Sequence, residues 1–162
     1  MVEAGLASEV WLTPCRLNPL KDGSTLMDNT TRLQLLHKAV AYGNERLGKE
    51  ALKVCETELG MPSPSYTCNT MEILRQSRPD CQFRLLVGAD SYLSFEKWKE
   101  WEWLQSRFAP IVYPRPGYEI TDLKPDWTLL RDVPLADISS TEIRAEMEKN
   151  GHLKDFLPWI GE

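Results

Sequence analysis

The sequence predicts a doubly wound α/β fold, in which a parallel sheet carries helices on both faces. Two observations support this class. Short apolar runs of strand length alternate along the chain with longer segments whose apolar residues recur at helical spacing. The 162 residues also suffice for one domain that buries roughly two-thirds of the surface exposed by its unfolded chain. We therefore expect residues 1–162 to form a single domain.

The first third of the chain contains two expected strands and one long helix. The residues before Gly5 have the character of a helix end, because glycine commonly follows the last helical turn. Val10–Leu12 predicts an apolar strand, and residues 51–57 predict a second one. Between them, residues 30–42 carry apolar side chains at the spacing of one helical face.

The rest of the chain continues this alternation. Asn69-Thr70-Met71-Glu72 resembles a capping box, which predicts a helix from Asn69 to about Gln76. The remaining expected elements are a strand at Phe83–Val87 that ends at Gly88, a helix over 96–108, a strand and turn within 110–117, and a strand at Trp127–Leu130.

Composition and charge argue against several classes of function. The formal net charge of −5 disfavours general nucleic-acid binding, which depends on lysine and arginine neutralising phosphates. No segment approaches the ~20 consecutive apolar residues of a membrane helix, and the N-terminus lacks the pattern of a signal peptide. The four cysteines and two histidines lack the spacing of a zinc site or a disulfide framework. We therefore expect a cytoplasmic protein with free thiols and without a nucleic-acid or membrane partner.

The segment ISSTEIR contains three consecutive hydroxyl side chains shortly before an arginine. Ser139 and Glu142 match the capping box of a helix, which explains one of these hydroxyls. The alternative is a phosphate site at the helix N-terminus, where unpaired N–H groups and the helix dipole favour an anion. Ser140 and Thr141 would donate further hydrogen bonds there, and Arg144 would add a forked cation. Spacing alone leaves both interpretations open.

Two other segments end in residues that suit nucleotide binding. In LLVGADS, Gly88 allows close backbone approach at the end of a strand, and Asp90 can accept hydrogen bonds from ribose hydroxyls. In YPRPG, Arg115 lies at the end of the next strand. Ligands of open α/β sheets bind beyond these carboxyl ends. A helix cap at Asp90 and a plain turn at Arg115 are the structural alternatives.

Tryptophan and histidine give weaker indications. Trp98, Trp101 and Leu104 recur at helical spacing, which more often reflects core packing than a ligand platform. His37 and His152 have no partner at the spacing of a metal or catalytic site. We therefore interpret both histidines as structural or surface residues.

Six segments occur in the order found in bacterial nicotinate-nucleotide adenylyltransferases, and the chain resembles this family from about Leu6 to Ile160. They are TPCRLNPLK, SYTCNTMEIL, LLVGADSYLSFEKW, YPRPG, ISSTEIR and LKDFLPWI. The resemblance implies a Rossmann-like nucleotidyltransferase that makes nicotinate adenine dinucleotide and pyrophosphate from ATP and nicotinate mononucleotide in NAD biosynthesis. It also implies a need for Mg²⁺, which would neutralise the triphosphate.

The resemblance further implies roles for individual residues. The ATP phosphates would be held by Ser140, Thr141 and Arg144, with Ser139 beside them. The other implied contacts are Gly88 and Asp90 with adenosine, the backbone around Arg115 with adenine, the Thr67 N–H with the nicotinate carboxylate, Trp98 with the pyridine ring, and Lys21 with the mononucleotide phosphate.

The chain departs from the family's pattern at its N-terminus. The family begins with a strand and a G-x-F-x-P-x-H-x-G-H loop whose histidines stabilise the reacting phosphates, and the sequence has no such segment. We expect an N-terminally truncated gene model that lacks this first, central strand. In the strand order 3-2-1-4-5 it would lie between Val10–Thr13 and Phe83–Val87, whose open edges would leave the chain poorly stable.

Two alternative functions stay open at this point. Pantetheine-phosphate adenylyltransferase shares the superfamily and has a similar length, although the SYT segment and Trp98 favour the pyridine substrate. A nucleotide-binding protein that has lost the catalytic loop is the non-enzymatic alternative. The motifs do not determine the oligomeric state or the preference between nicotinate and nicotinamide.

Overall fold

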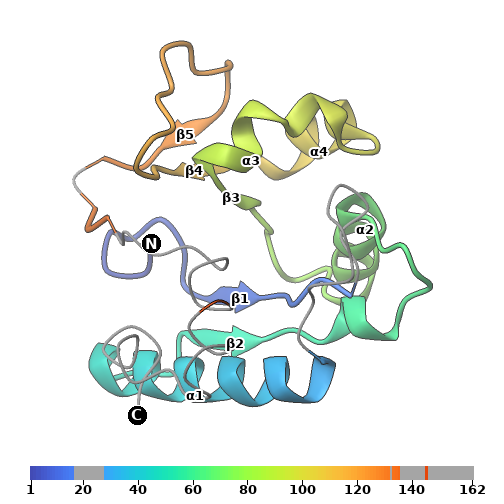
Figure 1. Cartoon of the computed structure of the whole chain (residues 1–162), viewed down its shortest axis with the longest axis vertical. Coiled ribbons are helices and arrows are strands. Elements are labelled where there is room, and N and C mark those ends of the chain that lie inside the picture. Colours follow the sequence, from blue (N-terminus) through green and yellow to red (C-terminus); the bar gives the residue numbers. More distant parts are fainter. Residues whose placement is uncertain (17–27, 132, 136–144, 146–162) are drawn as a thin grey trace. The chain divides into compact units, whose positions relative to one another are not determined.

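The structure is a computed structural model that describes residues 1–16, 28–131, 133–135 and 145. The described residues separate into two compact units, one within Met1–Ser65 and Ser140–Glu162 and the other within Tyr66–Ser139. Each unit has its own parallel sheet, β1-β2 in the first and β3-β4-β5 in the second (Figure 1). The expectation of a single domain stays a prediction.

The first residues of the chain have the geometry that closes an α-helix. Gly5 has a φ of 68°. Its N–H bonds to the Val2 carbonyl at 3.1 Å, and the Leu6 N–H bonds to the Met1 carbonyl at 3.1 Å. These two bonds around a left-handed glycine form a Schellman motif. The helix end expected before Gly5 is therefore present.

The first unit pairs β1 (Val10–Leu12) in parallel with β2 (Leu52–Val54), and α1 (Asn29–Leu47) packs on β2. The first expected strand is confirmed, and the second forms within the expected residues 51–57. The helix is longer than the expected 30–42, because Asp28 caps its start and Gly48, at a φ of 63°, ends it.

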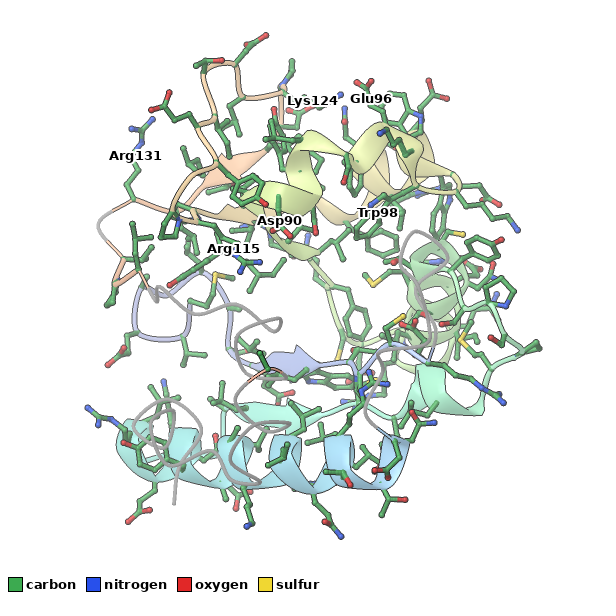
Figure 2. All side chains as sticks on the ribbon, in the orientation of Figure 1. Asp90, Glu96, Trp98, Arg115, Lys124 and Arg131 are labelled. Atoms are coloured by element: carbon green, nitrogen blue, oxygen red, sulfur yellow. The ribbon has the colours of Figure 1, made fainter. Side chains whose placement is uncertain are left out.

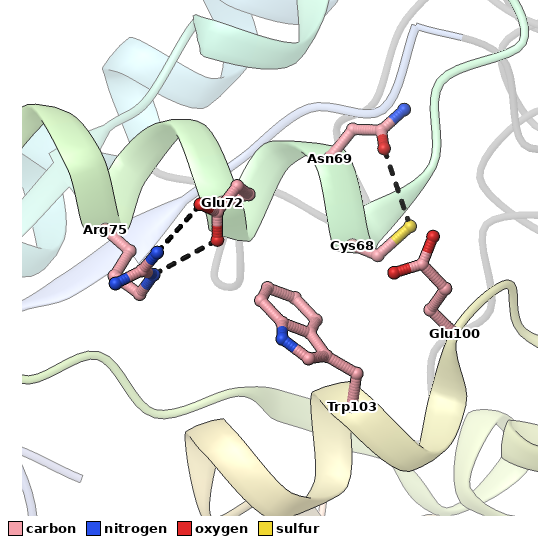
Figure 3. Close-up of a pocket in the computed structure, with 6 residues that line it drawn as sticks. All are labelled: Cys68, Asn69, Glu72, Arg75, Glu100 and Trp103. Atoms are coloured by element: carbon pink, nitrogen blue, oxygen red, sulfur yellow. Dashed lines mark hydrogen bonds and ion pairs between the residues drawn. The ribbon is translucent and has the colours of Figure 1, made fainter.

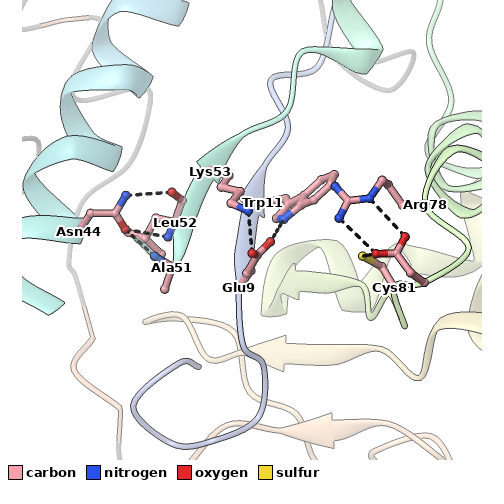
Figure 4. Close-up of polar contacts among 9 residues, drawn as sticks. Glu9, Trp11, Asn44, Ala51, Leu52, Lys53, Arg78 and Cys81 are labelled. Atoms are coloured by element: carbon pink, nitrogen blue, oxygen red, sulfur yellow. Dashed lines mark hydrogen bonds and ion pairs between the residues drawn. The ribbon is translucent and has the colours of Figure 1, made fainter. Parts of the chain in front are cut away.

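Asn44 joins the end of α1 to the beginning of β2. Its side-chain oxygen accepts from the N–H groups of Ala51 and Leu52 at 3.0 and 2.7 Å, and its amide nitrogen donates to the Leu52 carbonyl at 3.0 Å (Figure 4). Glu9, just before β1, accepts from the indole N–H of Trp11 in β1 at 2.8 Å and pairs with Lys53 of β2 at 2.6 Å. A short 3₁₀ helix, η2, follows at Thr57–Gly60.

The second unit holds three parallel strands in the order β3-β4-β5. Their bounds are β3 (Leu86–Gly88), β4 (Ile111–Tyr113) and β5 (Thr128–Leu129). The strand expected at Phe83–Val87 thus begins later and includes Gly88. Its partner β4 starts directly after Pro110, and backbone pairing continues one residue before β3. The Leu85 N–H donates to the Phe108 carbonyl at 3.2 Å, and the Leu85 carbonyl accepts from the Ile111 N–H at 2.8 Å.

The observed pairings agree with the predicted strand order within each unit. In the predicted numbering, β1 and β2 correspond to strands 2 and 3, and β3 and β4 correspond to strands 4 and 5. The expected missing strand between β1 and β3 stays a prediction, because these two strands belong to different units.

Helix α2 (Thr67–Ser77) begins before the expected start at Asn69, so the capping-box interpretation was wrong. Tyr66 is the N-cap and contributes no side-chain hydrogen bond. Glu72, expected to complete the box, instead pairs with Arg75 at 2.8 Å. The earlier start lets Cys68, Thr70, Met71 and Leu74 share one buried face.

The single helix expected over 96–108 was also wrong. The structure has α3 (Ala89–Leu93), the 3₁₀ helix η3 (Phe95–Lys97), a turn, and then α4 (Trp101–Phe108). Phe95 and Leu104 are both 0% exposed. At about 100° per residue, one continuous helix would point these two side chains in opposite directions. The turn at Glu100, whose φ is 55°, lets both reach the core.

Aromatic rings connect α3 and η3 to the segment before β5. Trp127 packs edge-to-face against Tyr92 at 4.9 Å and against Phe95 at 4.8 Å between ring centroids. The largest fully buried side chains of this unit are Phe95, Leu104, Ile111, Val112, Pro110 and Cys68. Among the described helices, none combines the length and apolarity required to cross a bilayer.

Candidate functional site

Three expected site residues meet at the carboxyl edge of the second sheet. Gly88 ends β3, and Asp90 is the second residue of α3, which follows directly. Arg115 lies two residues beyond the end of β4. Its Nη1 atom is 3.3 Å from Asp90 Oδ1, and Figure 2 places the two side chains close together below α3. Both are partly exposed, at 29% for Asp90 and 36% for Arg115.

The position of Gly88 has no room for a side chain. A Cβ atom added there would lie 2.6 Å from Asp90 Oδ1 and 3.2 Å from Arg115 Cδ. Such contacts are far inside van der Waals distance. A side chain at this position would therefore displace the Asp90 carboxylate from Arg115, and glycine leaves the ion pair in place.

The backbone around Arg115 forms a tight turn. The Arg115 carbonyl accepts from the Tyr118 N–H at 3.2 Å, and the same two residues form an isolated antiparallel bridge. Gly117 has a φ of 78°, which favours glycine at the third position of such a turn, and Pro116 suits the second. The plain turn proposed as the structural alternative is present, and it coexists with the contact to Asp90.

Thr67 and Trp98 lie elsewhere in the second unit. Thr67 is the first residue of α2, where an N–H group has no intrahelical acceptor. Trp98 follows η3, and its ring packs on Phe95 at 5.1 Å between centroids. The Trp98 side chain is half-buried, whereas Leu104 is in the core. Trp98 and Leu104, which were expected on one face, therefore differ in burial.

Half of the expected site residues fall outside the described part of the chain. They are Lys21, Ser139, Ser140, Thr141 and Arg144. The choice between a helix cap and a phosphate site at ISSTEIR therefore stays open structurally.

A pocket of about 320 Å³ lies between α2 and α4 (Figure 3). Cys68, Asn69, Glu72 and Arg75 line it from α2. Glu100 and Trp103 line it from the other side. Burial, and to a smaller extent the Glu100 carboxylate, raises the pKa of the Cys68 thiol. This thiol therefore stays protonated at neutral pH, which disfavours a nucleophilic role.

Sequence reasoning missed the contacts that hold the segment before β5. The Tyr92 hydroxyl donates to the Asp122 carbonyl at 2.7 Å and accepts from the Lys124 N–H at 2.9 Å. The Lys124 ammonium pairs with Glu96 and lies 4.9 Å from the centre of the Trp101 ring. These partners are far apart in the chain, so no local pattern indicates them.

A polar cluster in the first unit surrounds Cys15. The Ser65 hydroxyl donates to Glu58 Oε1 at 2.5 Å, and Cys15 Sγ lies 3.7 Å from the Ser65 oxygen. Both Glu58 and Ser65 are buried. Burial raises the pKa of the Cys15 thiol from 9.0 to about 11, and the Glu58 carboxylate contributes in the same direction.

We expect this thiol to make folding stability depend on alkaline pH. Between pH 9 and about 11 the unfolded thiol loses its proton while the folded one retains it. The free energy of unfolding should therefore fall as the pH rises through this window, and it should fall less in Cys15→Ser. Urea denaturation at several pH values measures both curves. Parallel curves for the two proteins would contradict the expectation.

Comparison with known proteins decides the family. The model of the cytidylyltransferase-like family matches residues 3–146. The chain belongs to the cytidylyltransferase-like family. The matched range includes every expected site residue. Of the six family segments, only LKDFLPWI lies beyond it.

Two relatives illustrate how much of this cytidylyltransferase-like chain is shared. A probable nicotinate-nucleotide adenylyltransferase of Porphyromonas gingivalis is 34% identical over 152 residues, which is 93% of this chain and 74% of the relative. A second probable nicotinate-nucleotide adenylyltransferase, of Flavobacterium johnsoniae, is 32% identical over 162 residues. This match covers 98% of this chain and 80% of the relative. The expected resemblance to bacterial nicotinate-nucleotide adenylyltransferases is thus confirmed.

Solved structures confirm the fold of this family member. Nicotinic acid mononucleotide adenylyltransferase of Plasmodium falciparum, complexed with APC, matches with a TM-score of 0.71 and 20% identity. The match covers 95% of this chain and 76% of the other. The same protein complexed with NaAD gives a TM-score of 0.72. The predicted Rossmann-like α/β fold is therefore correct.

Proposed function

We propose that the chain transfers the adenylyl group of ATP to nicotinate mononucleotide, producing nicotinate adenine dinucleotide and pyrophosphate in NAD biosynthesis. One observation carries this proposal. Relatives named for this activity are more than 30% identical over more than nine-tenths of the chain. The carboxyl edge of the second sheet, where ligands of open α/β sheets bind, supports it independently.

ATP contacts are assigned to this edge from the structure and to the ISSTEIR segment from the sequence alone. Gly88 brings bare backbone to the nucleotide, Asp90 accepts hydrogen bonds from the ribose, and the turn at Arg115 lines the adenine. The triphosphate contacts are assigned to Ser139, Ser140, Thr141 and Arg144 on the basis of the sequence. A forked guanidinium and hydroxyl donors suit phosphate oxygens.

The acceptor subsite uses three other residues. The Thr67 N–H, at the first position of α2, points a helix N-terminus at the nicotinate carboxylate. Trp98, which is half-buried and supported by Phe95, stacks on the pyridine ring. Lys21 neutralises the mononucleotide phosphate.

The reaction requires no covalent intermediate with the protein. An oxygen of the mononucleotide phosphate attacks the α-phosphorus of ATP, the new P–O bond forms, and the bond to pyrophosphate breaks. The chain's contribution is positioning and charge stabilisation. We assign Mg²⁺ to the triphosphate and treat it as part of the substrate, because this ion is usually held largely by substrate phosphates.

The proposal is tested on the protein produced from its complete reading frame. We expect nicotinate adenine dinucleotide to form only when ATP, Mg²⁺ and nicotinate mononucleotide are all present. Turnover only with 4′-phosphopantetheine would assign the other adenylyltransferase activity. ATP binding without transfer to either acceptor would favour the non-catalytic alternative. A cytoplasmic location belongs to the same proposal, since both substrates are intracellular metabolites.

Thr67 permits a test that separates its backbone from its side chain. We expect Thr67→Pro to raise the KM for nicotinate mononucleotide about tenfold or more, because proline removes the N–H but is tolerated at the first helical position. Tyr66 already has the extended backbone, φ −119° and ψ 136°, that a following proline demands.

The matched control is Thr67→Ala, which keeps the N–H and should change this KM little. Steady-state kinetics at saturating ATP measure both variants. Equal KM values for the two variants would remove Thr67's backbone from the acceptor subsite.

A further inference from the structure

Asp90 and Arg115 meet because of strand register. Gly88 of β3 is paired with Tyr113 of β4, and each charged residue lies two positions beyond its member of this pair. Equal offsets bring the two side chains to the same level past the carboxyl edge of the sheet. The resulting Nη1–Oδ1 distance is 3.3 Å.

The backbone on both sides is held independently of the ion pair. Ala89, next to Asp90, is 0% exposed and anchors the start of α3 in the core. Arg115 stands between two prolines, whose rings fix φ, and its carbonyl is bonded to the Tyr118 N–H. Because the backbone is fixed at both residues, the ion pair determines only the side-chain rotamers of Asp90 and Arg115.

The ion pair engages one oxygen of the carboxylate. Oδ1 faces Arg115 and occupies the space that a Cβ on Gly88 would need. In the part of the chain that the structure describes, Asp90 Oδ2 has no hydrogen-bonding partner. The Asp90 side chain is 29% exposed, so the carboxylate is not sealed in the core.

Stability does not account for this arrangement. Ion pairs as exposed as this one contribute little to the free energy of unfolding. Two electrostatic consequences remain. The guanidinium fixes which way the carboxylate faces, and it offsets a negative charge that would otherwise repel a nearby triphosphate.

We propose that the Arg115 side chain is a positioning residue that presents Asp90 Oδ2 to the sugar hydroxyls of the bound nucleotide. The inference rests on the proposed function and deepens it. It concerns the guanidinium of Arg115, whereas the proposed adenine contact concerns the backbone around this residue. The ligand class is a ribonucleoside triphosphate. Discrimination against nucleotides that lack a ribose hydroxyl therefore depends on Arg115.

The test compares ATP with 2′-deoxy-ATP and 3′-deoxy-ATP in the protein from the complete reading frame. For Arg115→Ala we expect the KM for ATP to rise about tenfold, with a much smaller change in kcat. The kcat/KM for at least one deoxy analogue should hardly change, because the hydroxyl that Asp90 would bind is missing. Arg115→Lys, which keeps a cation, should recover part of the discrimination. An unchanged ratio between ATP and both analogues in Arg115→Ala would overturn the proposal.

Arg84→Ala is the matched control. Arg84 also bridges strands of this sheet, bonding to the Ala109 carbonyl and the Thr128 hydroxyl at 3.0 Å each. It precedes β3 and so lies at the opposite, amino edge. We expect this variant to lower stability without changing the ratio between ATP and the deoxy analogues. A similar loss of discrimination in Arg84→Ala would show a general structural effect and would also overturn the proposal.

Equilibrium binding separates this inference from the proposed function. Calorimetric titration with ATP and the two deoxy analogues needs no transfer step. Binding that depends on a ribose hydroxyl and on Arg115, without adenylyl transfer, would support the positioning role and reject the proposed reaction. Adenylyl transfer that does not depend on Arg115 would support the proposed reaction and reject the positioning role. Absence of nucleotide binding in the unsubstituted protein would reject both.

Discussion

Phe95→Ala is expected to lower the free energy of unfolding by about 3–5 kcal/mol, the usual range for removing a buried phenylalanine. Phe95 is 0% exposed, and its ring packs on Trp127 at 4.8 Å and on Trp98 at 5.1 Å. The substitution leaves a cavity beside Trp98 and Trp127 and removes both ring contacts. A loss of this size is a large part of the 5–15 kcal/mol typical of a domain.

Urea denaturation followed by tryptophan fluorescence measures this loss. Leu93→Ala is the control, because Leu93 lies two residues away with 58% of its surface exposed and should change stability by no more than about 0.5 kcal/mol. If Phe95→Ala fails to fold, Phe95→Leu should show an intermediate loss. Equal midpoints for Phe95→Leu, Leu93→Ala and the unsubstituted protein would contradict the described core.

Gly88→Ala is expected to reduce kcat/KM for ATP about 10- to 150-fold. The new Cβ, 2.6 Å from Oδ1, forces the Asp90 carboxylate out of its position beside Arg115. One charge-assisted hydrogen bond to the nucleotide is then lost, which corresponds to roughly 1.5–3 kcal/mol. Steady-state kinetics with ATP as the varied substrate measure the effect.

Gly60→Ala is the control for the general effect of adding a methyl group to a glycine. A Cβ at Gly60 would have no atom within 4 Å, and this glycine does not have a positive φ. We expect its kcat/KM to match that of the unsubstituted protein. If Gly88→Ala also retained full kcat/KM, the carboxyl edge of the second sheet would not be the nucleotide site.

The elements that local signals specify were predicted well. Glycine after a helical turn marked the helix end at Gly5, and alternating apolar segments located β1 and β4 within one or two residues. These features depend on the backbone preferences of one or a few residues, so a linear sequence displays them. The site residues Gly88 and Asp90 were found for the same reason, because they follow directly from a recognisable strand.

Local signals misled where packing had the larger effect. The capping box at Asn69 was chemically reasonable, yet α2 begins at Thr67, where the helix can bury Cys68 and Met71. The spacing of Trp98 and Leu104 suggested one helix face, whereas the chain turns at Glu100 between them. In each case buried apolar area outweighs the few tenths to about one kcal/mol of a local preference.

By itself the sequence determined the parallel α/β class, the helix end that Gly5 closes, the family, and the residue types at the candidate site. Only the tertiary structure decided that Asp90 and Arg115, 25 positions apart, form an ion pair in the space that a side chain at Gly88 would need. It likewise decided that Lys124 and Tyr92 hold the segment before β5. The physical reason is that periodicity and turn preferences act between near neighbours, whereas these contacts depend on strand register and core packing.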